Sequence, residues 1–143
     1  MKQTFFFLSL VFLLTSCGGV TTTPIEEFKL SIDLPSGWKI YKDNFKGKFT
    51  VELSTGGRRV MTIKEANPAV ESLDMLVQAA SKSFEVTNKE SFANGFGITL
   101  KTKNKKQFIY YIQKNGKQYL FEPAAHYKEI DLNKAIAIVK SVK

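Results

Sequence analysis

Two residue types that often build active sites are scarce in this sequence, which contains one cysteine, Cys17, and one histidine, His126. A disulfide within the chain would need a second cysteine. Structural zinc sites use several ligands, mostly histidine and cysteine, so this composition disfavours one. We therefore expect no metal and no cofactor. His126 has Glu122 and Glu129 nearby in the sequence, but a surface or cap role explains it better than general-base catalysis.

Motifs of catalysis and of phosphate binding are also missing. No serine lies in the G-x-S-x-G context of a nucleophile elbow. Gly18-Gly19 and Gly56-Gly57 match neither of the glycine-rich fingerprints that bind phosphate groups. No spacing among the 13 acidic residues indicates an acid–base dyad. The sequence thus predicts a protein that is not an enzyme, with a hydrolase as the weaker alternative.

The apolar run at residues 5–14 is too short to cross a bilayer as a helix, which takes about 20 residues. Lys2 precedes this run, and two small residues, Thr15 and Ser16, follow it directly before Cys17. A positive residue, a short apolar run and small residues in this order are typical of a signal peptide. We interpret residues 1–16 as such a peptide and exclude them from the fold.

The segment Leu14-Thr15-Ser16-Cys17 resembles the lipobox of bacterial lipoproteins. In that family the cysteine thiol receives a diacylglyceryl group, the peptide is cut just before it, and the new amino terminus is acylated, often with palmitate. The resemblance implies lipidation of Cys17, and two or more acyl chains anchor a protein stably. An ordinary secretory signal is the alternative. Gly18 replaces the aspartate associated with inner-membrane retention, so we expect the outer membrane rather than the inner.

After the anchor, we expect residues 17–24 to be the lipidated cysteine and a tether, and residues 25–143 to form one globular domain. Residues 18–24 are small and polar, and seven extended residues reach at most about 25 Å. The chain carries 21 basic and 13 acidic side chains, a net charge of +8, and the removal of Lys2 lowers it by one. Such a balance suits anionic lipid, lipopolysaccharide or an acidic protein face. A periplasmic location argues against nucleic acid.

Alternating apolar residues predict several strands, over residues 28–34, 49–53, 59–63, 96–100, 107–113 and 119–121. Residues 107–113 are apolar on both faces, which indicates a central strand covered on both sides. Gly56-Gly57 and Asn115-Gly116 are hairpin signals, since both pairs tolerate the positive φ of tight turns.

Two helices are predicted from apolar residues at helical spacing. The first has Ser72 as its cap and Asp74 in its first turn, and the second has Asp131 as its cap. The stripe of the first is Leu73, Leu76, Val77, Ala80 and Phe84, and that of the second is Leu132, Ala135, Ile136 and Val139. The predicted fold class is α+β.

The order of these elements, with Leu34-Pro35-Ser36-Gly37-Trp38 after the first strand and Ser72-Leu73-Asp74 at the first helix, resembles the PsbP-like family. That family includes the PsbP extrinsic photosystem protein, a nuclear Ran-release factor and bacterial envelope lipoproteins of the DcrB type. The resemblance implies an antiparallel sheet of about six strands flanked by helices, an α/β/α sandwich, and the binding of other proteins without catalysis. Trp38 is expected in the core rather than at a partner surface.

Lysines gather around the strands of residues 96–122. Arg58 and Arg59 would join them if their hairpin were adjacent. Lysines on turns and edges also prevent edge-to-edge pairing, which is the simpler explanation. The candidate anion- or partner-binding residues are Lys101, Lys103, Lys105 and Lys106; Lys114 and Lys117 lie in the next turn, at the other end of the middle strand.

The sequence therefore predicts a lipid-anchored envelope protein that faces the periplasm and binds another envelope protein as a non-enzymatic scaffold. The first alternative is a binder of anionic lipid or lipopolysaccharide through the basic turns. The second is a hydrolase of cell-wall or lipid material. The sequence names no partner, oligomeric state or biological process.

Overall fold

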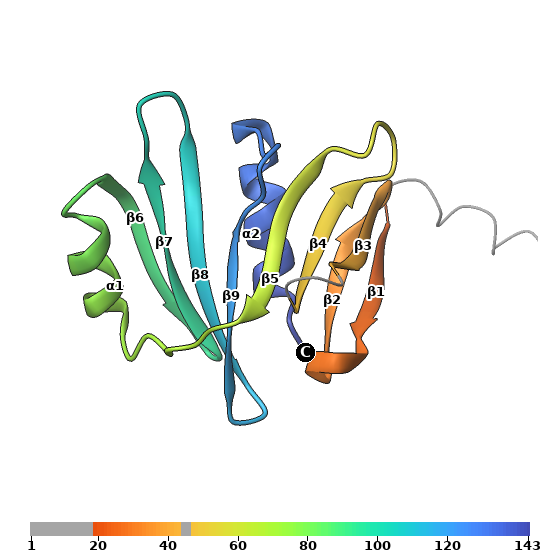
Figure 1. Ribbon diagram of the computed structural model, residues 1–143, viewed down its shortest axis with the longest axis horizontal. Helices are drawn as coiled ribbons and strands as arrows, with labels where there is room; N and C mark the ends of the chain where they lie inside the picture. Colours follow the sequence, from red (N-terminus) through yellow and green to blue (C-terminus); the bar gives the residue numbers. More distant parts are fainter. Residues whose placement is uncertain (1–18, 44–46) are drawn as a thin grey trace, which may run out of the picture.

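An antiparallel sheet of seven strands runs through the centre of the fold (Figure 1). The computed structural model describes residues 19–43 and 47–143, so the predicted signal peptide and Cys17 lie outside the described residues. The strand order is β3-β4-β5-β9-β8-β7-β6, and every neighbouring pair is antiparallel. The strands are β3 (Trp38–Asp43), β4 (Lys48–Leu53), β5 (Arg59–Glu65), β6 (Glu85–Phe92), β7 (Gly95–Lys101), β8 (Lys106–Lys114) and β9 (Lys117–Pro123).

Two further strands, β1 (Val20–Ile25) and β2 (Leu30–Pro35), form a separate antiparallel hairpin. A short 3-10 helix, η1 (Glu26–Phe28), connects them. The described residues thus contain nine strands where the sequence predicted about six. The additional strands lie at sheet edges, where one face or both remain exposed and the apolar alternation is weak.

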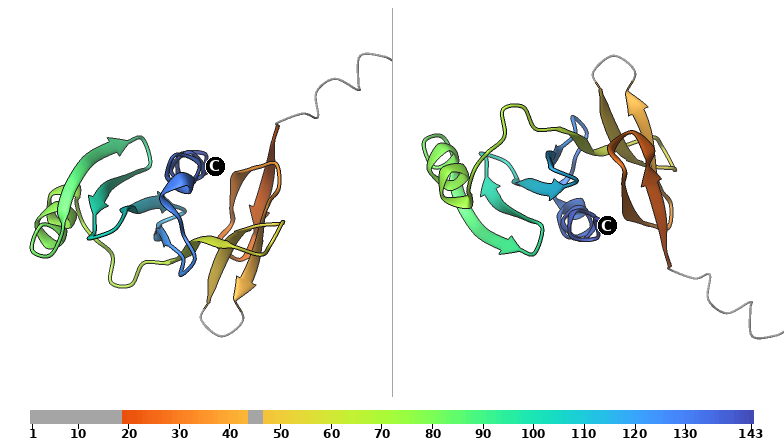
Figure 2. Two further views of the ribbon diagram at one scale, coloured as in Figure 1. Left: turned by 90° about the horizontal axis from the view of Figure 1, so that it is seen from above. Right: turned by 90° about the horizontal axis from the view of Figure 1, so that it is seen from below.

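The helices cover opposite faces of the seven-stranded sheet. α1 (Leu73–Ala80) packs on β6 and β7, whereas α2 (Leu132–Lys140) packs on β8 and on β2 (Figure 2). A second 3-10 helix, η2 (Glu129–Asp131), leads directly into α2. This arrangement confirms the predicted α+β class with helices on both sides of a sheet.

Two apolar clusters follow from this layering. The larger lies between α2, the β1–β2 hairpin and the inner face of the sheet, and there the Phe28 ring centroid is 4.8 Å from that of Tyr119 and 5.0 Å from that of Phe49. Trp38 is 8% exposed and belongs to this cluster, so the predicted core position is confirmed. The smaller cluster lies under α1 and is centred on Leu76, Ala80, Ile98 and Leu100.

Several local predictions are confirmed. Asn115 and Gly116 have φ values of 54° and 73°, as the β8–β9 turn requires. The Ser72 hydroxyl accepts a hydrogen bond from the Met75 amide at 3.2 Å and caps α1. β8 is an interior strand whose two faces contribute to the two different apolar clusters.

The prediction of a tether at residues 18–24 is wrong for residues 20–24. Val20–Ile25 is strand β1, which pairs with β2 along its whole length. Threonines suit a strand whose outer side meets water, and Ile25 is the only buried residue of β1. One buried residue produces no period that a sequence pattern can reveal. Strand pairing is therefore present from Val20, closer to Cys17 in the sequence than expected.

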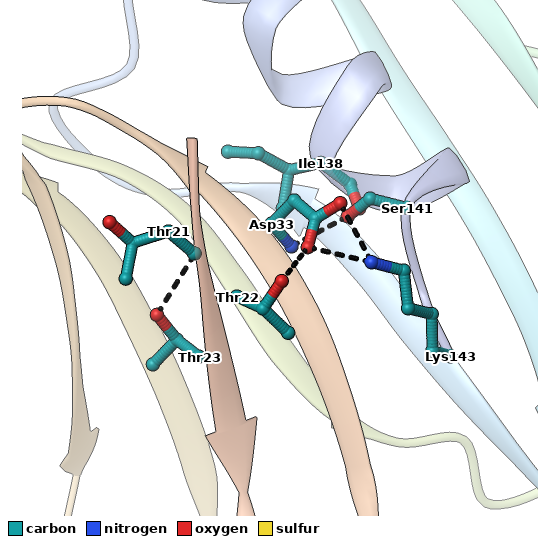
Figure 3. A network of polar contacts seen from close by, with 7 residues as sticks. All are labelled: Thr21, Thr22, Thr23, Asp33, Ile138, Ser141 and Lys143. Carbon is teal, nitrogen blue, oxygen red and sulfur yellow. Dashed lines mark hydrogen bonds and ion pairs between the residues drawn. The ribbon is translucent and has the colours of Figure 1, made fainter. Parts of the chain in front are cut away.

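Polar contacts fasten this hairpin to the C-terminal side of α2 (Figure 3). The Asp33 carboxylate accepts hydrogen bonds from the Thr22 hydroxyl at 2.7 Å and from the Lys143 ammonium at 3.1 Å. Asp33 N–H donates to the Ser141 hydroxyl at 2.8 Å, and that hydroxyl donates to the Ile138 carbonyl at 2.6 Å. Lys143 also exchanges two backbone hydrogen bonds of 3.1 Å with Ser31. Residue 143 thus continues the pairing on the free side of β2.

Two predictions about the helices need correction. α1 ends at Ala80, so Phe84 does not belong to its apolar stripe; its side chain is 46% exposed. Polar residues at 81–83 end the helix and leave Phe84 directly before β6. Asp131 stands at the N-cap position of α2, but its side chain makes no capping hydrogen bond to the helix. It binds the guanidinium of Arg58 instead.

Candidate functional site

The four candidate lysines lie at the turn between β7 and β8. Lys101 and Lys106 are paired in register as the last and first residues of these strands. The turn is closed by the backbone N–H and hydroxyl of Thr102, which both donate to the Lys105 carbonyl at 3.0 Å. Lys101, Lys103 and Lys106 are exposed. The turn therefore presents three of the four predicted lysines to solvent.

Lys105 has a different role. Its ammonium donates to the Tyr127 carbonyl at 3.0 Å and lies 5.2 Å from the centre of the Tyr127 ring. Burial raises the pKa of Tyr127 to about 12, and Glu129 and Asp131 add to the rise. The neutral Tyr127 hydroxyl donates to the Lys106 carbonyl at 2.9 Å. Lys105 thus holds the turn against the segment after β9 and is not available to a ligand in this arrangement.

An open groove lies between the end of α1, the edge strand β6 and the β7–β8 turn. One hollow, of about 860 Å³, is lined by Phe84, Glu85, Lys101 and Lys103 among others. A second hollow, of about 600 Å³, follows β6 from Phe84 to Lys89 beneath Val77 of α1. The two hollows share Ser81, Phe84 and Glu85 and are called the β6 groove below.

The charges of the molecule are distributed unevenly around this groove. The lysines of β3, β4 and β5 (Lys39, Lys42, Lys48 and Lys64) all form ion pairs with acidic side chains. The described part of the chain offers no ion pair to the side chains of Lys89, Lys101, Lys103 or Lys106. The lysines beside the groove therefore carry positive charge that no ion pair within the described residues neutralises.

The other basic residues considered from the sequence do not join this site. Arg58 forms an ion pair with Asp131, and the contact raises the pKa of the Arg58 guanidinium. Lys117 lies at the opposite end of the sheet in the β8–β9 turn, where its ammonium is 3.1 Å from the Glu65 carboxylate. The expectation that the two lysine turns need not form one patch is confirmed.

A polar network joins β6 to α2 on the inner face of the sheet. The Tyr110 hydroxyl donates to Glu90 at 2.5 Å, and Lys140 donates to the other oxygen of the same carboxylate at 2.6 Å. The hydrogen bond from Lys140, then that from Tyr110, lowers the pKa of Glu90, while burial raises the pKa of Tyr110. Each group is thus held in its ordinary ionisation state, which fits a structural network.

His126 is exposed in the segment between β9 and η2. Within residues 19–43 and 47–143, the acidic, histidine and cysteine side chains form no cluster of three or more that could hold a metal ion. Across the same residues, no helix is both long enough and apolar enough to span a bilayer.

A seven-stranded antiparallel sheet with a helix on each face and an added N-terminal hairpin defines a PsbP-like α+β fold. One solved structure of similar fold is that of the cyanobacterial PsbP, CyanoP, of Synechocystis sp. PCC 6803, determined in solution. The TM-score is 0.53 at 14% identity, and the match covers 91% of this chain and 98% of that chain. The predicted PsbP-like fold is confirmed, and an identity this low shows the fold alone. No protein-family model matches the sequence, and the comparison with curated proteins gave no match.

The sequence missed part of the β6 groove. Phe84 was assigned to the stripe of α1, because its spacing from Ala80 fits a helix. The polar segment Ser81-Lys82-Ser83 was the available signal for an earlier helix end. β6 itself carries polar residues on both faces and shows no period. Lys101 and Lys103 are candidates from the sequence, but nothing local indicated that they line one hollow together with Phe84.

Proposed function

We propose that this protein is a lipoprotein of the cell envelope whose PsbP-like domain binds another envelope protein and catalyses no reaction. The observation that carries the proposal is the combination of a lipobox-like segment ending at Cys17 with a PsbP-like domain directly behind it. Fold alone is weak evidence for function, and the anchor supplies the second support.

The start of β1 makes the arrangement compact. Val20 already pairs with Pro35, so only two glycines separate Cys17 from the strand. Three residue steps span about 10 Å when extended. A lipid on Cys17 holds the domain against the membrane surface, and its partner lies in or beside the same membrane, which we propose to be the outer membrane on its periplasmic side.

The anchor is tested with the Cys17→Ser variant of the full chain in a bacterial host that processes lipoproteins. The wild-type protein should incorporate a clickable palmitate analogue and sediment with outer-membrane vesicles in a density gradient. The serine variant should lose the label, since the diacylglyceryl group is transferred to a thiol. Equal labelling of the two proteins would contradict the assignment of Cys17.

Partner binding is tested separately, by cross-linking and affinity capture from intact membranes. The tagged wild-type protein should recover the same envelope protein in repeated experiments at a level well above that of a tag-only control. Recovery of nothing beyond the control would contradict the scaffold function. Release of a labelled fragment from peptidoglycan or lipid by the purified protein would instead support the hydrolase alternative.

A further inference from the structure

We propose that the β6 groove binds an extended, acidic segment of the partner protein, which adds to the sheet as a further strand beside β6. The proposal rests on the proposed function, because it takes the partner to be a protein. It adds the surface that the partner occupies and the chemistry by which the partner is recognised.

β6 is one of the two edge strands of the large sheet; β3 is the other. β6 has eight residues and pairs with β7 on one side, and no strand of the described residues pairs with its other side. An edge strand presents a row of unpaired N–H and C=O groups, which an extended peptide can complete. A bulge between Val86 and Asn88 removes Thr87 from the register with β7, whereas residues 88–92 pair regularly. The regular part offers a template for several backbone hydrogen bonds.

The groove supplies contacts for side chains as well. Its second hollow runs along β6 beneath α1, where a strand laid against β6 would place alternate side chains. Phe84 is 46% exposed and lines both hollows. Large exposed aromatic side chains in a concave surface are common anchors of protein interfaces. Phe84 therefore offers an apolar contact at the centre of the groove.

The charge of the lysines that line the groove favours one kind of occupant. Three lysines line the groove (Lys89, Lys101 and Lys103), and their ammonium groups have no acidic partner within the described residues. Glu85 is the one acidic side chain among the described lining residues and is paired in register with Lys101. Complementary charge steers association and sets specificity, so an acidic segment is favoured. A second copy of this chain would bring the same unpaired lysines and is disfavoured.

The position of the groove separates it from the anchoring membrane. β1 lies at one end of the long axis of the molecule, and α1 and β6 lie at the other (Figure 1). A lipid on Cys17 would therefore hold the β1 end at the bilayer and direct the groove away from it. In that orientation the headgroups of the bilayer would not reach the lysines, which favours an acidic protein segment as the occupant.

The test uses the full-length protein in nanodiscs of neutral lipid and a short peptide of alternating valine and glutamate. Amide NMR shifts should change at residues 81–92 and 101–104 as the peptide is added. Methylation of every backbone nitrogen of the peptide should weaken binding at least about tenfold, because the added strand then cannot donate hydrogen bonds. A peptide with lysine in place of glutamate should cause no shift.

Matched charge reversals identify the surface. The double variant Lys101→Glu/Lys103→Glu should bind the acidic peptide at least about tenfold more weakly. The double variant Lys29→Glu/Lys114→Glu changes the net charge equally at the other end of β8 and should stay within about twofold of the wild type. Phe84→Ser should weaken binding without changing its dependence on salt, because the apolar contact carries no charge.

Several results would overturn the proposal. These are no shift at residues 81–92 with about 1 mM peptide, equal binding of the N-methylated peptide, or equal losses in the two charge-reversal variants. Equal shifts with inorganic polyphosphate or with anionic vesicles would show a general anion site instead. A captured partner that cross-links elsewhere on the domain would remove this groove and leave the scaffold function intact. Failure of Cys17 labelling would remove the anchor and leave the groove untouched.

Discussion

Asp131 carries its charge in a position that is only 4% exposed. The Arg58 guanidinium donates to both carboxylate oxygens, with Nη2 3.1 Å from Oδ1. This ion pair connects Arg58, which follows the β4–β5 turn, to Asp131 at the start of α2. A carboxylate buried this far is stable in its charged form only while its partner is present.

The first prediction concerns this ion pair. Arg58→Met leaves the Asp131 carboxylate without its counter-charge and should lower the free energy of unfolding by about 2–3 kcal/mol, less than for a fully buried pair because Arg58 remains partly exposed. Urea unfolding followed by circular dichroism measures the change.

Two further variants serve as controls for that prediction. Lys42→Met removes the pair with Glu27, in which both side chains are about half exposed, and should cost less than about 1 kcal/mol. The double variant Arg58→Met/Asp131→Leu should recover most of the lost stability, because no buried charge remains. Equal losses in Arg58→Met and Lys42→Met would show that burial of Asp131 does not matter.

At the scale of elements, the β1–β2 hairpin depends on contacts that come from the far end of the chain. Its buried side chains join the larger apolar cluster, and Asp33 and Ser31 bind the residues that follow α2. The hydrogen bonds of the Asp33 carboxylate to Thr22 and Lys143 are exposed to solvent, and the one from Asp33 N–H to Ser141 is only partly buried. The hairpin should therefore open more readily than the central strands.

The second prediction uses the pH dependence of this attachment. Hydrogen bonds from Thr22 and then Lys143 lower the pKa of Asp33 below its ordinary value of 3.8. The folded state thus favours the ionised carboxylate. Its stabilisation is complete above pH 3.8 and is lost as the pH falls through the lower pKa of the folded state. Hydrogen-exchange protection of β1 and β2 should decline over that range, after correction for the intrinsic exchange rate.

Asp33→Asn should reduce the protection of β1 and β2 already at neutral pH and should remove this step. Glu90→Gln is the matched control, because it disrupts the network between β6 and α2 but leaves the hairpin contacts in place. Equal protection of the hairpin in the wild type and in Asp33→Asn at every pH would contradict the role of Asp33.

For the whole molecule, the distance between the proposed anchor and the groove follows from the opposite positions of β1 and β6 (Figure 1). Cys17 is the one cysteine of the chain, so the proposed lipidation would leave no free thiol. New cysteines at exposed positions can therefore be labelled selectively.

The third prediction places a fluorophore on Thr21→Cys or on Lys103→Cys of the lipidated protein in nanodiscs that contain spin-labelled lipid. The label at Thr21 should be quenched strongly and the label at Lys103 weakly, because β1 adjoins the anchor and the β7–β8 turn lies far along the molecule. Equal quenching at the two positions would show that the groove end also contacts the bilayer.

Features that depend on neighbours in the sequence were predicted well. The turn at Asn115-Gly116, the cap at Ser72 and the doubly apolar strand β8 each depend on a few consecutive residues. The conformations that glycine permits and the alternation of a covered strand are local properties, so the pattern carries them.

Features that depend on packing between distant segments were not predicted from the sequence. β1 and β6 are polar edge strands whose pairing depends on β2 and β7, and no period marks them. Asp131 pairs with a residue 73 positions away rather than capping its own helix. Lys105 binds Tyr127 while Lys101 and Lys103 remain unpaired, which depends on where acidic and carbonyl groups arrive in space.

Composition and order of residues thus established the lipobox-like segment, the α+β class and the set of candidate lysines. The three-dimensional arrangement determines which of those lysines are paired and which are not. It also leaves Phe84 exposed beside them and places the groove at the end of the molecule opposite β1. The physical reason is the sequence separation of the contacts involved. Turns, helix caps and apolar periods arise from contacts within a few residues. Charge neutralisation, edge exposure and grooves arise only when segments far apart in the chain meet.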